Sequence, residues 1–65
     1  MEPHQQRVVN ELQELDVKLE KLTSFLDSSI FAGLDRAEQR RLYLQHHLMS
    51  GYSIVLAERI NAFSR

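Results

Sequence analysis

Six large aliphatic residues in the first half of the chain recur at alternating spacings of four and three, and this pattern constrains the fold more than any other feature. They are Val8, Leu12, Leu15, Leu19, Leu22 and Leu26. Such a period is typical of a helix that packs lengthwise against another helix, and not of a strand. Pro3 stands where the first turn of a helix tolerates proline. We therefore predict a helix from about residue 3 to 27.

A second helix is predicted from about residue 35 to 63, after a loop at residues 28–34. The loop, SSIFAGL, holds two serines and a glycine, which interrupt the helical pattern. Asp35 is a good N-cap, and Glu38 three residues later resembles the partner residue of a capping box. Gln45 and Arg59 fall where the heptad requires apolar residues. The apolar stripe of this helix consists of Leu42, Met49, Tyr52, Leu56, Ile60 and Phe63.

Two long helices joined by a short loop predict an all-α antiparallel helical hairpin, with residues 1–65 forming a single domain. A chain of 65 residues buries only about 60% of its extended surface, and this chain has no cysteine for a disulfide. We therefore expect the hairpin to assemble into an oligomer. Gly51 is expected to let another helix approach closely. The seam of one hairpin leaves further apolar residues on its flanks for other copies to cover, namely Val9, Val17, Leu44, Leu48, Ile54 and Val55.

Charge and hydropathy exclude several classes of protein. The net charge is −1, with −3 in residues 1–27 and +2 in residues 28–65, so neither half is a basic arm for duplex nucleic acid. No apolar run approaches the roughly 20 residues that span a bilayer, and the N-terminal residues lack the features of a signal peptide. We expect a cytoplasmic protein with no membrane partner. A small DNA-binding regulator is disfavoured by the acidic first helix.

Catalysis is not expected from these residues. The chain has no cysteine nucleophile, no glycine-rich phosphate loop and no Ser-His-Asp set that can be placed on one face. His46 and His47 are adjacent and point about 100° apart on a helix, whereas histidines that share a metal on a helix are three or four residues apart. We predict a protein that is not an enzyme and that uses neither a metal nor another cofactor.

Two lysines on the first helix have two interpretations. Lys18 and Lys21 are three residues apart and share a face. They could form a solvated surface paired with Glu14 and Glu11, or they could meet a small anionic ligand. Both interpretations stay open at the level of these residues.

Arg59 lies between Leu56 and Ile60, where a buried arginine would need a glutamate of the first helix or an anionic ligand. Tyr52 is expected in the core, as is Phe63. Phe31 is undecided, because a loop rarely holds a large aromatic residue without a packing or binding role.

Four segments of the chain together resemble a known family. They are PHQQRVVNE, LDVKLEKLTSFL, SSIFAGLDRAEQRRL and YSIVLAERINAF. These segments resemble very short phage proteins, the anti-CBASS sponges, which sequester the cyclic oligonucleotide messengers of bacterial antiphage signalling. The resemblance covers nearly the whole chain, and its most telling parts are K-L-T at residues 21–23 and IFAGL…EQ around the loop.

The resemblance implies a homohexamer, a trimer of dimers, in the cytoplasm of an infected bacterial host. It implies cyclic dinucleotides in one class of pocket and, for many members, cyclic trinucleotides in another, both bound without cleavage. A lysine contacts the phosphates in this family and a threonine completes the pocket, and these roles fall on Lys21 and Thr23. The alternative function is a structural or regulatory helical-hairpin oligomer that binds only protein partners.

One position departs from the family pattern. Family members often stack an aromatic residue of the first helix on a base, and by spacing this position falls near Gln6. The stacking role would then move to His4 or to Phe31. Arg7 and Arg59 complete the set of candidate ligand-binding residues as cations for a small anionic ligand.

Helical geometry limits how Lys21 and Thr23 can share a ligand. Two residues apart, they point about 200° apart on a regular helix. They can meet one ligand if it lies between two subunits, or if the helix unwinds at Thr23. A cyclic dinucleotide is nearly two-fold symmetric and suits an isologous dimer interface, and a cyclic trinucleotide suits a three-fold axis. We expect the loop to close over such a pocket, with Thr23 or Ser24 offering a hydroxyl.

Overall fold

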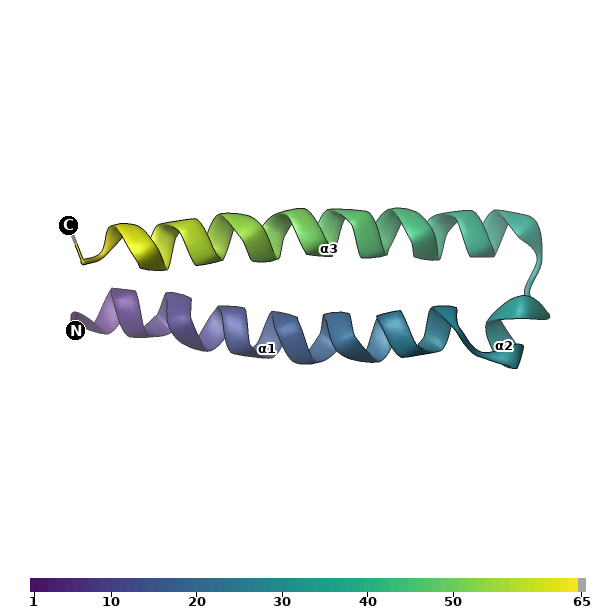
Figure 1. The fold of residues 1–65 in the computed structure, drawn as a ribbon, viewed down its shortest axis with the longest axis horizontal. Helices are drawn as coiled ribbons and strands as arrows, with labels where there is room; N and C mark the ends of the chain where they lie inside the picture. Colours follow the sequence, from purple (N-terminus) through teal and green to yellow (C-terminus); the bar gives the residue numbers. More distant parts are fainter. Residues whose placement is uncertain (65) are drawn as a thin grey trace.

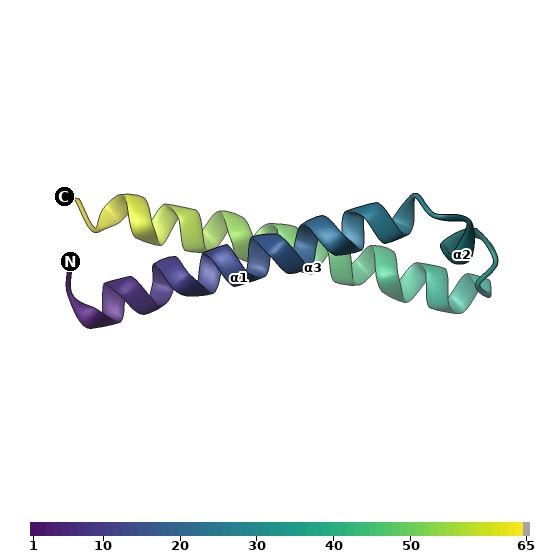
Figure 2. The same cartoon turned by 90° about the horizontal axis from the view of Figure 1, so that it is seen from below.

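Two long antiparallel helices dominate the computed structural model, which describes residues 1–64 (Figure 1). Helix α1 spans Pro3–Leu26 and helix α3 spans Arg36–Ala62, and they pack against each other along their length. A single helical turn, α2, spans Ser29–Ala32 at the closed end, while the start of α1 and the end of α3 lie at the open end. The second view shows α1 and α3 crossing near their middle (Figure 2). The predicted all-α antiparallel hairpin is confirmed.

The connection between the long helices differs from the predicted loop because it contains α2. Ser28 caps this turn, since its Oγ accepts a hydrogen bond from the amide of Phe31 at 3.1 Å. The side chain of Phe31 is buried, which holds the turn against the hairpin. The serines and the glycine therefore predicted correctly where the long helices are interrupted. The segment between them is helical because Ser28 caps it and the ring of Phe31 is buried.

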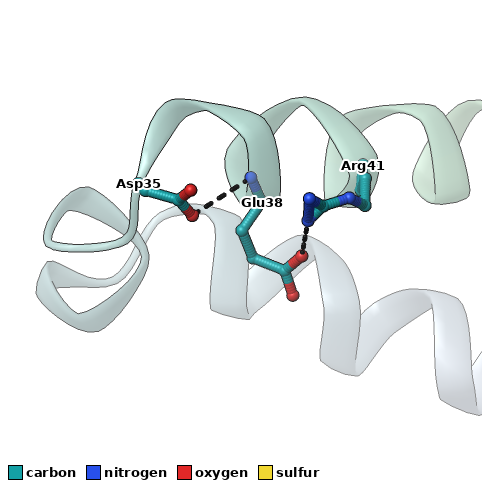
Figure 3. Close-up of polar contacts among 3 residues, drawn as sticks. All are labelled: Asp35, Glu38 and Arg41. Atoms are coloured by element: carbon teal, nitrogen blue, oxygen red, sulfur yellow. Dashed lines mark hydrogen bonds and ion pairs between the residues drawn. The ribbon is translucent and has the colours of Figure 1, made fainter.

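Both long helices begin with side-chain hydrogen bonds to the backbone. The amide of Glu2 donates to Oε1 of Gln5 at 2.9 Å, just before α1. The predicted N-cap of α3 is confirmed, because the amide of Glu38 donates to Oδ1 of Asp35 at 3.3 Å (Figure 3). The carboxylate of Glu38 binds Arg41 at 2.8 Å (Figure 3). A complete capping box would also have the amide of Asp35 donating to the side chain of Glu38, and this bond is absent in residues 1–64. The carboxylate of Glu38 binds the charged guanidinium of Arg41 instead, which is a stronger donor than a neutral amide.

The core lies between α1 and α3 and is small. Val8, Leu15 and Leu56 are buried, and Leu56 is fully inaccessible. Around them pack Leu12, Met49, Ile60 and Phe63. These contacts confirm the first half of the heptad seam of α1 and the larger part of the predicted stripe of α3, and the other seam residues of α1 are half-buried: Leu19, Leu22 and Leu26.

The contact positions of α3 explain one error in the prediction. One inner set repeats every seven residues, as predicted: Leu42, Met49, Leu56 and Phe63. A heptad seam needs a second set either three or four residues further on. The predicted stripe took Tyr52 from the set three residues on, whose other positions are Gln45 and Arg59, and it took Ile60 from the set four residues on.

The prediction for Tyr52 is wrong, because Gln45, Tyr52 and Arg59 are all exposed, whereas the prediction for Ile60 is confirmed by its packing against the core. The inner positions lie four residues on, and each is half-buried: His46, Ser53 and Ile60. Arg59 is therefore not a buried cation, and no ion pair joins it to a glutamate of α1 within residues 1–64. This rotation of α3 brings Leu56, Met49 and Ile60 into the core against α1.

A single hairpin leaves much of its apolar surface uncovered. Only four of residues 1–64 are buried, and the molecule measures 46 × 15 × 14 Å. Among the predicted flank residues of the two helices, Val9 is half-buried. The others are exposed: Val17, Leu44, Leu48, Ile54 and Val55. No helix within residues 1–64 is apolar enough over a sufficient length to cross a membrane.

Candidate functional site

A groove of about 310 Å³ runs along α1 and is lined by Val17, Glu20, Lys21 and Ser24. These residues follow the spacing of one helical face, on the side of α1 turned away from the seam with α3. Its lining within residues 1–64 comes from α1 alone, so a single chain leaves the groove open on its outer side. A neighbouring molecule could close it.

Lys21 is the cation of this groove, and its side chain is exposed. Within residues 1–64 the one ion pair joins Arg41 to Glu38, so Lys21 forms no ion pair with an acidic residue of α1. Glu20 beside it balances its formal charge. The groove of one chain can therefore attract an anion by direct contact with the ammonium group rather than by a broad positive field.

Thr23 faces the opposite flank and contacts α3. Its Oγ1 donates to the carbonyl of Leu19 at 2.8 Å and lies 2.9 Å from Nε2 of His46. A hydroxyl has one hydrogen, and the bond to Leu19 uses it, so Nε2 of His46 carries the proton donated to Thr23. The threonine hydroxyl is thus occupied by these two contacts at the exposed edge of the seam, whereas Ser24 shares the groove with Lys21.

A second polar contact joins the helices one heptad away. Oγ of Ser53 donates to Oδ1 of Asp16 at 2.8 Å. Asp16 and Thr23 are seven residues apart on α1, and His46 and Ser53 are seven apart on α3. The two contacts therefore repeat in the same antiparallel register. The heptad spacing of these polar residues is a signal that could have identified His46 and Ser53 from the sequence.

Removing the threonine hydroxyl should measure the contact between Thr23 and His46. We expect Thr23→Val to lower the free energy of unfolding by about 0.5–1.5 kcal/mol, because an interhelical hydrogen bond is lost at nearly constant side-chain shape. Urea denaturation measures this loss. Thr23→Val combined with His46→Ala should cost less than the sum of the two single changes. His47→Ala is the control and should stay within about 0.5 kcal/mol, since His47 is exposed; additive losses would contradict the pairing.

The helix geometry decides between the two arrangements left open for Lys21 and Thr23. Helix α1 continues without a break to Leu26, so it does not unwind at Thr23. Lys21 and Thr23 point to opposite sides of the hairpin. If both contact one ligand, they do so from different subunits.

Phe31 lies at the closed end within a small aromatic cluster. Its ring makes edge contacts with Phe25 and Tyr43, at centroid distances of 6.2 and 5.2 Å. Gln39 of α3 supports the turn by donating from Nε2 to the carbonyl of Phe31 at 3.0 Å. A ring that is only 6% exposed is not available to stack on a base in the single chain, and Ile30 is the exposed apolar side chain of the turn.

The remaining candidate residues lie at the open end of the hairpin. His4, Gln6 and Arg7 are exposed on the first turns of α1, and Arg59 is exposed on the last turn of α3. Nε2 of Gln6 donates to Oδ1 of Asn10 at 3.0 Å. Gln6 and Lys21 are separated by about 22 Å along α1, at 1.5 Å per residue. One chain therefore does not bring the open-end candidates together with Lys21.

Candidate metal ligands are dispersed. Within the part of the chain that the structure describes, no group of three or more histidine, cysteine, aspartate or glutamate side chains could hold a metal ion. His46, the histidine with an interhelical partner, binds Thr23 through Nε2.

Comparison with known proteins assigns the family. A family model described as Sequestin matches residues 2–62, nearly the whole chain. The chain belongs to the Sequestin family. Neither a search of curated proteins nor a search of solved structures found a match. Sequestin membership indicates a small helical protein that sequesters a target, and the hairpin of α1 and α3 that carries the groove falls almost entirely within the matched residues.

Proposed function

We propose that this Sequestin protein is a non-enzymatic sponge for the cyclic oligonucleotide signals of antiphage immunity. Cyclic dinucleotides are its first ligand class and cyclic trinucleotides its second. It acts in the cytoplasm of an infected bacterium and holds the ligand without cleaving it. Family membership supports the sequestering role. The resemblance to anti-CBASS sponges supports the choice of ligand.

The observation that carries the proposal is the groove beside Lys21. An exposed ammonium group without an acidic partner among residues 1–64 lies in one groove with the hydroxyl of Ser24. A phosphate accepts hydrogen bonds from both groups, and the bond from a charged donor is the stronger. We assign the phosphate contact to Lys21, and we assign the nearby hydroxyl to Ser24.

The proposed pocket is shared between copies of the chain. The groove is open on its outer side, and the other candidate residues lie on another flank or at the far end of the hairpin. In this proposal a neighbouring copy supplies them: Thr23, His4, Gln6, Arg7 and Arg59. A hexamer built as a trimer of dimers would provide two-fold and three-fold sites, matching the symmetry of the two ligand classes.

Thermal melting with and without ligand tests the function. We expect a saturating cyclic dinucleotide to raise the melting temperature by about 5 °C or more, because a ligand that binds only the folded oligomer stabilises it by mass action. A linear dinucleotide with the same bases is the control and should shift the melting temperature far less. Ligand released by heat should elute as the intact cyclic species in chromatography.

Two outcomes would contradict the proposal. The absence of a shift with every cyclic di- and trinucleotide would favour the hairpin oligomer that binds only protein partners. Recovery of linear products would indicate a nuclease instead of a sponge.

A further inference from the structure

Two arginines at the start of α3 have no acidic partner among residues 1–64. Arg36 is the first residue of the helix and Arg40 lies one turn further on, and both are exposed. The nearest acidic residues in the sequence are already engaged (Figure 3). The carboxylate of Asp35 accepts a hydrogen bond from the amide of Glu38, and the carboxylate of Glu38 binds Arg41. Neither forms an ion pair with Arg36 or Arg40.

The placement of these two arginines is unfavourable for the helix itself. A positive charge in the first turn opposes the helix dipole, as Arg36 does. Like charges four residues apart share a face and repel each other, as Arg36 and Arg40 do. Within residues 1–64 no ion pair offsets either effect. Local rules that are broken without a gain inside the chain are typical of functional surfaces, and an anionic group from outside would relieve both effects.

Tyr43 places an anchored aromatic ring beside the two arginines. Its side chain is 57% exposed, and its ring makes an edge contact with the buried ring of Phe31 at a centroid distance of 5.2 Å. The turn that carries Phe31 is in turn held by Nε2 of Gln39, which donates to the carbonyl of Phe31 at 3.0 Å. The ring of Tyr43 is therefore held by the hairpin while much of it stays accessible. A partner that covers it loses little affinity to the ordering of this side chain.

Four exposed residues of α3 recur at spacings of four, three and four, which is the pattern of one helical face. We call this surface the arginine face, and it consists of Arg36, Arg40, Tyr43 and His47. Two exposed apolar residues, Leu44 and Leu48, border it. Glu38, the acidic residue within this stretch, lies on the opposite side of the helix. The arginine face is thus cationic and aromatic, with an apolar border.

The shape of the arginine face favours a macromolecule over a small ligand. Its residues project from one helix, so the surface is convex, and none of them lines the groove on α1. Sites for small molecules are concave and bury most of the ligand. An ion pair on an open surface is weak by itself, so several contacts must act together. A partner with a folded or extended chain can supply them at once.

The composition of the face favours a protein over a nucleic acid. Binding to nucleic acid depends on cations that follow successive phosphates, whereas two arginines stand here beside leucines in a chain of net charge −1. Arginine and tyrosine are the residues enriched at the centres of protein interfaces. The planar guanidinium group of arginine binds a carboxylate through two parallel hydrogen bonds. The matching partner surface is therefore acidic.

We propose that the arginine face docks an acidic segment of a partner protein. Two carboxylates of this segment, one helical turn apart, pair with Arg36 and Arg40. An apolar side chain next to them packs on Tyr43 and Leu44. This inference goes beyond the proposed function, because it concerns a protein partner and a surface of α3, whereas the proposed ligand contact is made by Lys21 of α1. Its test uses no cyclic oligonucleotide, so the two can fail independently.

The test measures fluorescence anisotropy of a labelled helical peptide with the full-length chain at low salt. The peptide carries two glutamates one turn apart and a leucine on the same face. We expect Arg40→Gln to weaken binding about fivefold or more, because a charge-assisted hydrogen bond is lost. Arg36→Gln should act in the same direction. Arg41→Gln is the matched control, since it removes the same charge from an exposed residue off the face that is paired with Glu38. It should change the affinity less than about twofold.

Two further measurements complete the test. A peptide with glutamine in place of both glutamates should bind more weakly than the acidic peptide, and added salt should weaken the acidic peptide because it screens exposed charges. Circular dichroism verifies that the variants are helical, as expected for exposed side chains without a hydrogen bond or ion pair among residues 1–64.

Four results would overturn the proposal. The wild type could fail to bind the acidic peptide in preference to the glutamine peptide. Arg40→Gln could bind the acidic peptide as tightly as the wild type does. A single-stranded oligonucleotide of equal charge could bind more tightly than the peptide and depend on Arg40, which would identify a nucleic-acid surface. Arg40→Gln could abolish self-association in sedimentation experiments without peptide, which would show that another copy of the chain covers the face.

Discussion

Replacing Lys21 with alanine is expected to weaken the binding of a cyclic dinucleotide about tenfold to a hundredfold. The lysine ammonium is assigned to a ligand phosphate, and hydrogen bonds to charged groups contribute roughly 1.5–3 kcal/mol. The side chain is exposed in the single chain, so the change should leave the hairpin fold intact. Isothermal titration calorimetry measures the affinity, and light scattering of the same samples verifies the oligomer.

Lys18→Ala is the control for this prediction. Lys18 is also an exposed lysine of α1, three residues earlier, but it does not line the groove. It should change the affinity by less than about threefold, as expected for a charge that only contributes to the general field. If the Lys21→Ala oligomer is intact and binds as tightly as the wild type, Lys21 is not in the site.

Truncating Leu56 is expected to have the largest effect on stability. Leu56 is fully inaccessible and packs with Val8 and Leu15 in the core. Leu56→Ala should lower the free energy of unfolding by about 2–5 kcal/mol, since it removes buried methyl groups and leaves a cavity. A small domain has only about 5–15 kcal/mol of net stability, so this variant should be unfolded or close to unfolding at 37 °C.

Chemical denaturation at fixed protein concentration measures the effect of Leu56→Ala. Ile54→Ala is the matched control, two residues earlier on α3 and 61% exposed. It should cost less than about 0.5 kcal/mol in a single hairpin. Equal losses for both variants would mean that the core of the protein is not the α1–α3 seam.

The aromatic cluster at the closed end shows what the large apolar residues of the segment SSIFAGL, residues 28–34, do. Phe31 joins the hairpin's own packing through Phe25 and Tyr43, while Ile30 remains exposed. The ring of Phe31 therefore belongs to the packing of the hairpin itself. The sequence left the role of Phe31 open, because a single turn can point either Ile30 or Phe31 inward.

The candidate site could be predicted only in part from the sequence. Lys21 was chosen by its resemblance to the family lysine and its ligand contact stays a prediction, while its place on a face with Val17 and Ser24 follows from helical spacing. The pairing of Thr23 with His46 was missed. The heptad spacing of Asp16 and Thr23, and of His46 and Ser53, could have indicated these residues, but the register that brings Thr23 and His46, 23 positions apart, into contact comes from the tertiary structure.

The existence, length and antiparallel order of the two helices were determined by the sequence, since heptad period, caps and a short connection act within a few residues of each other. Asp35 begins α3 for this local reason. The rotation of α3 about its own axis was decided only by the tertiary structure. Positions 45, 52 and 59 and positions 46, 53 and 60 both satisfy a seven-residue repeat. The second set faces inward together with the packing of Leu56, Met49 and Ile60 against α1, and the contacts of Thr23 and Asp16 with His46 and Ser53 add to it at the exposed edge of the seam. This rotation leaves Arg59 exposed.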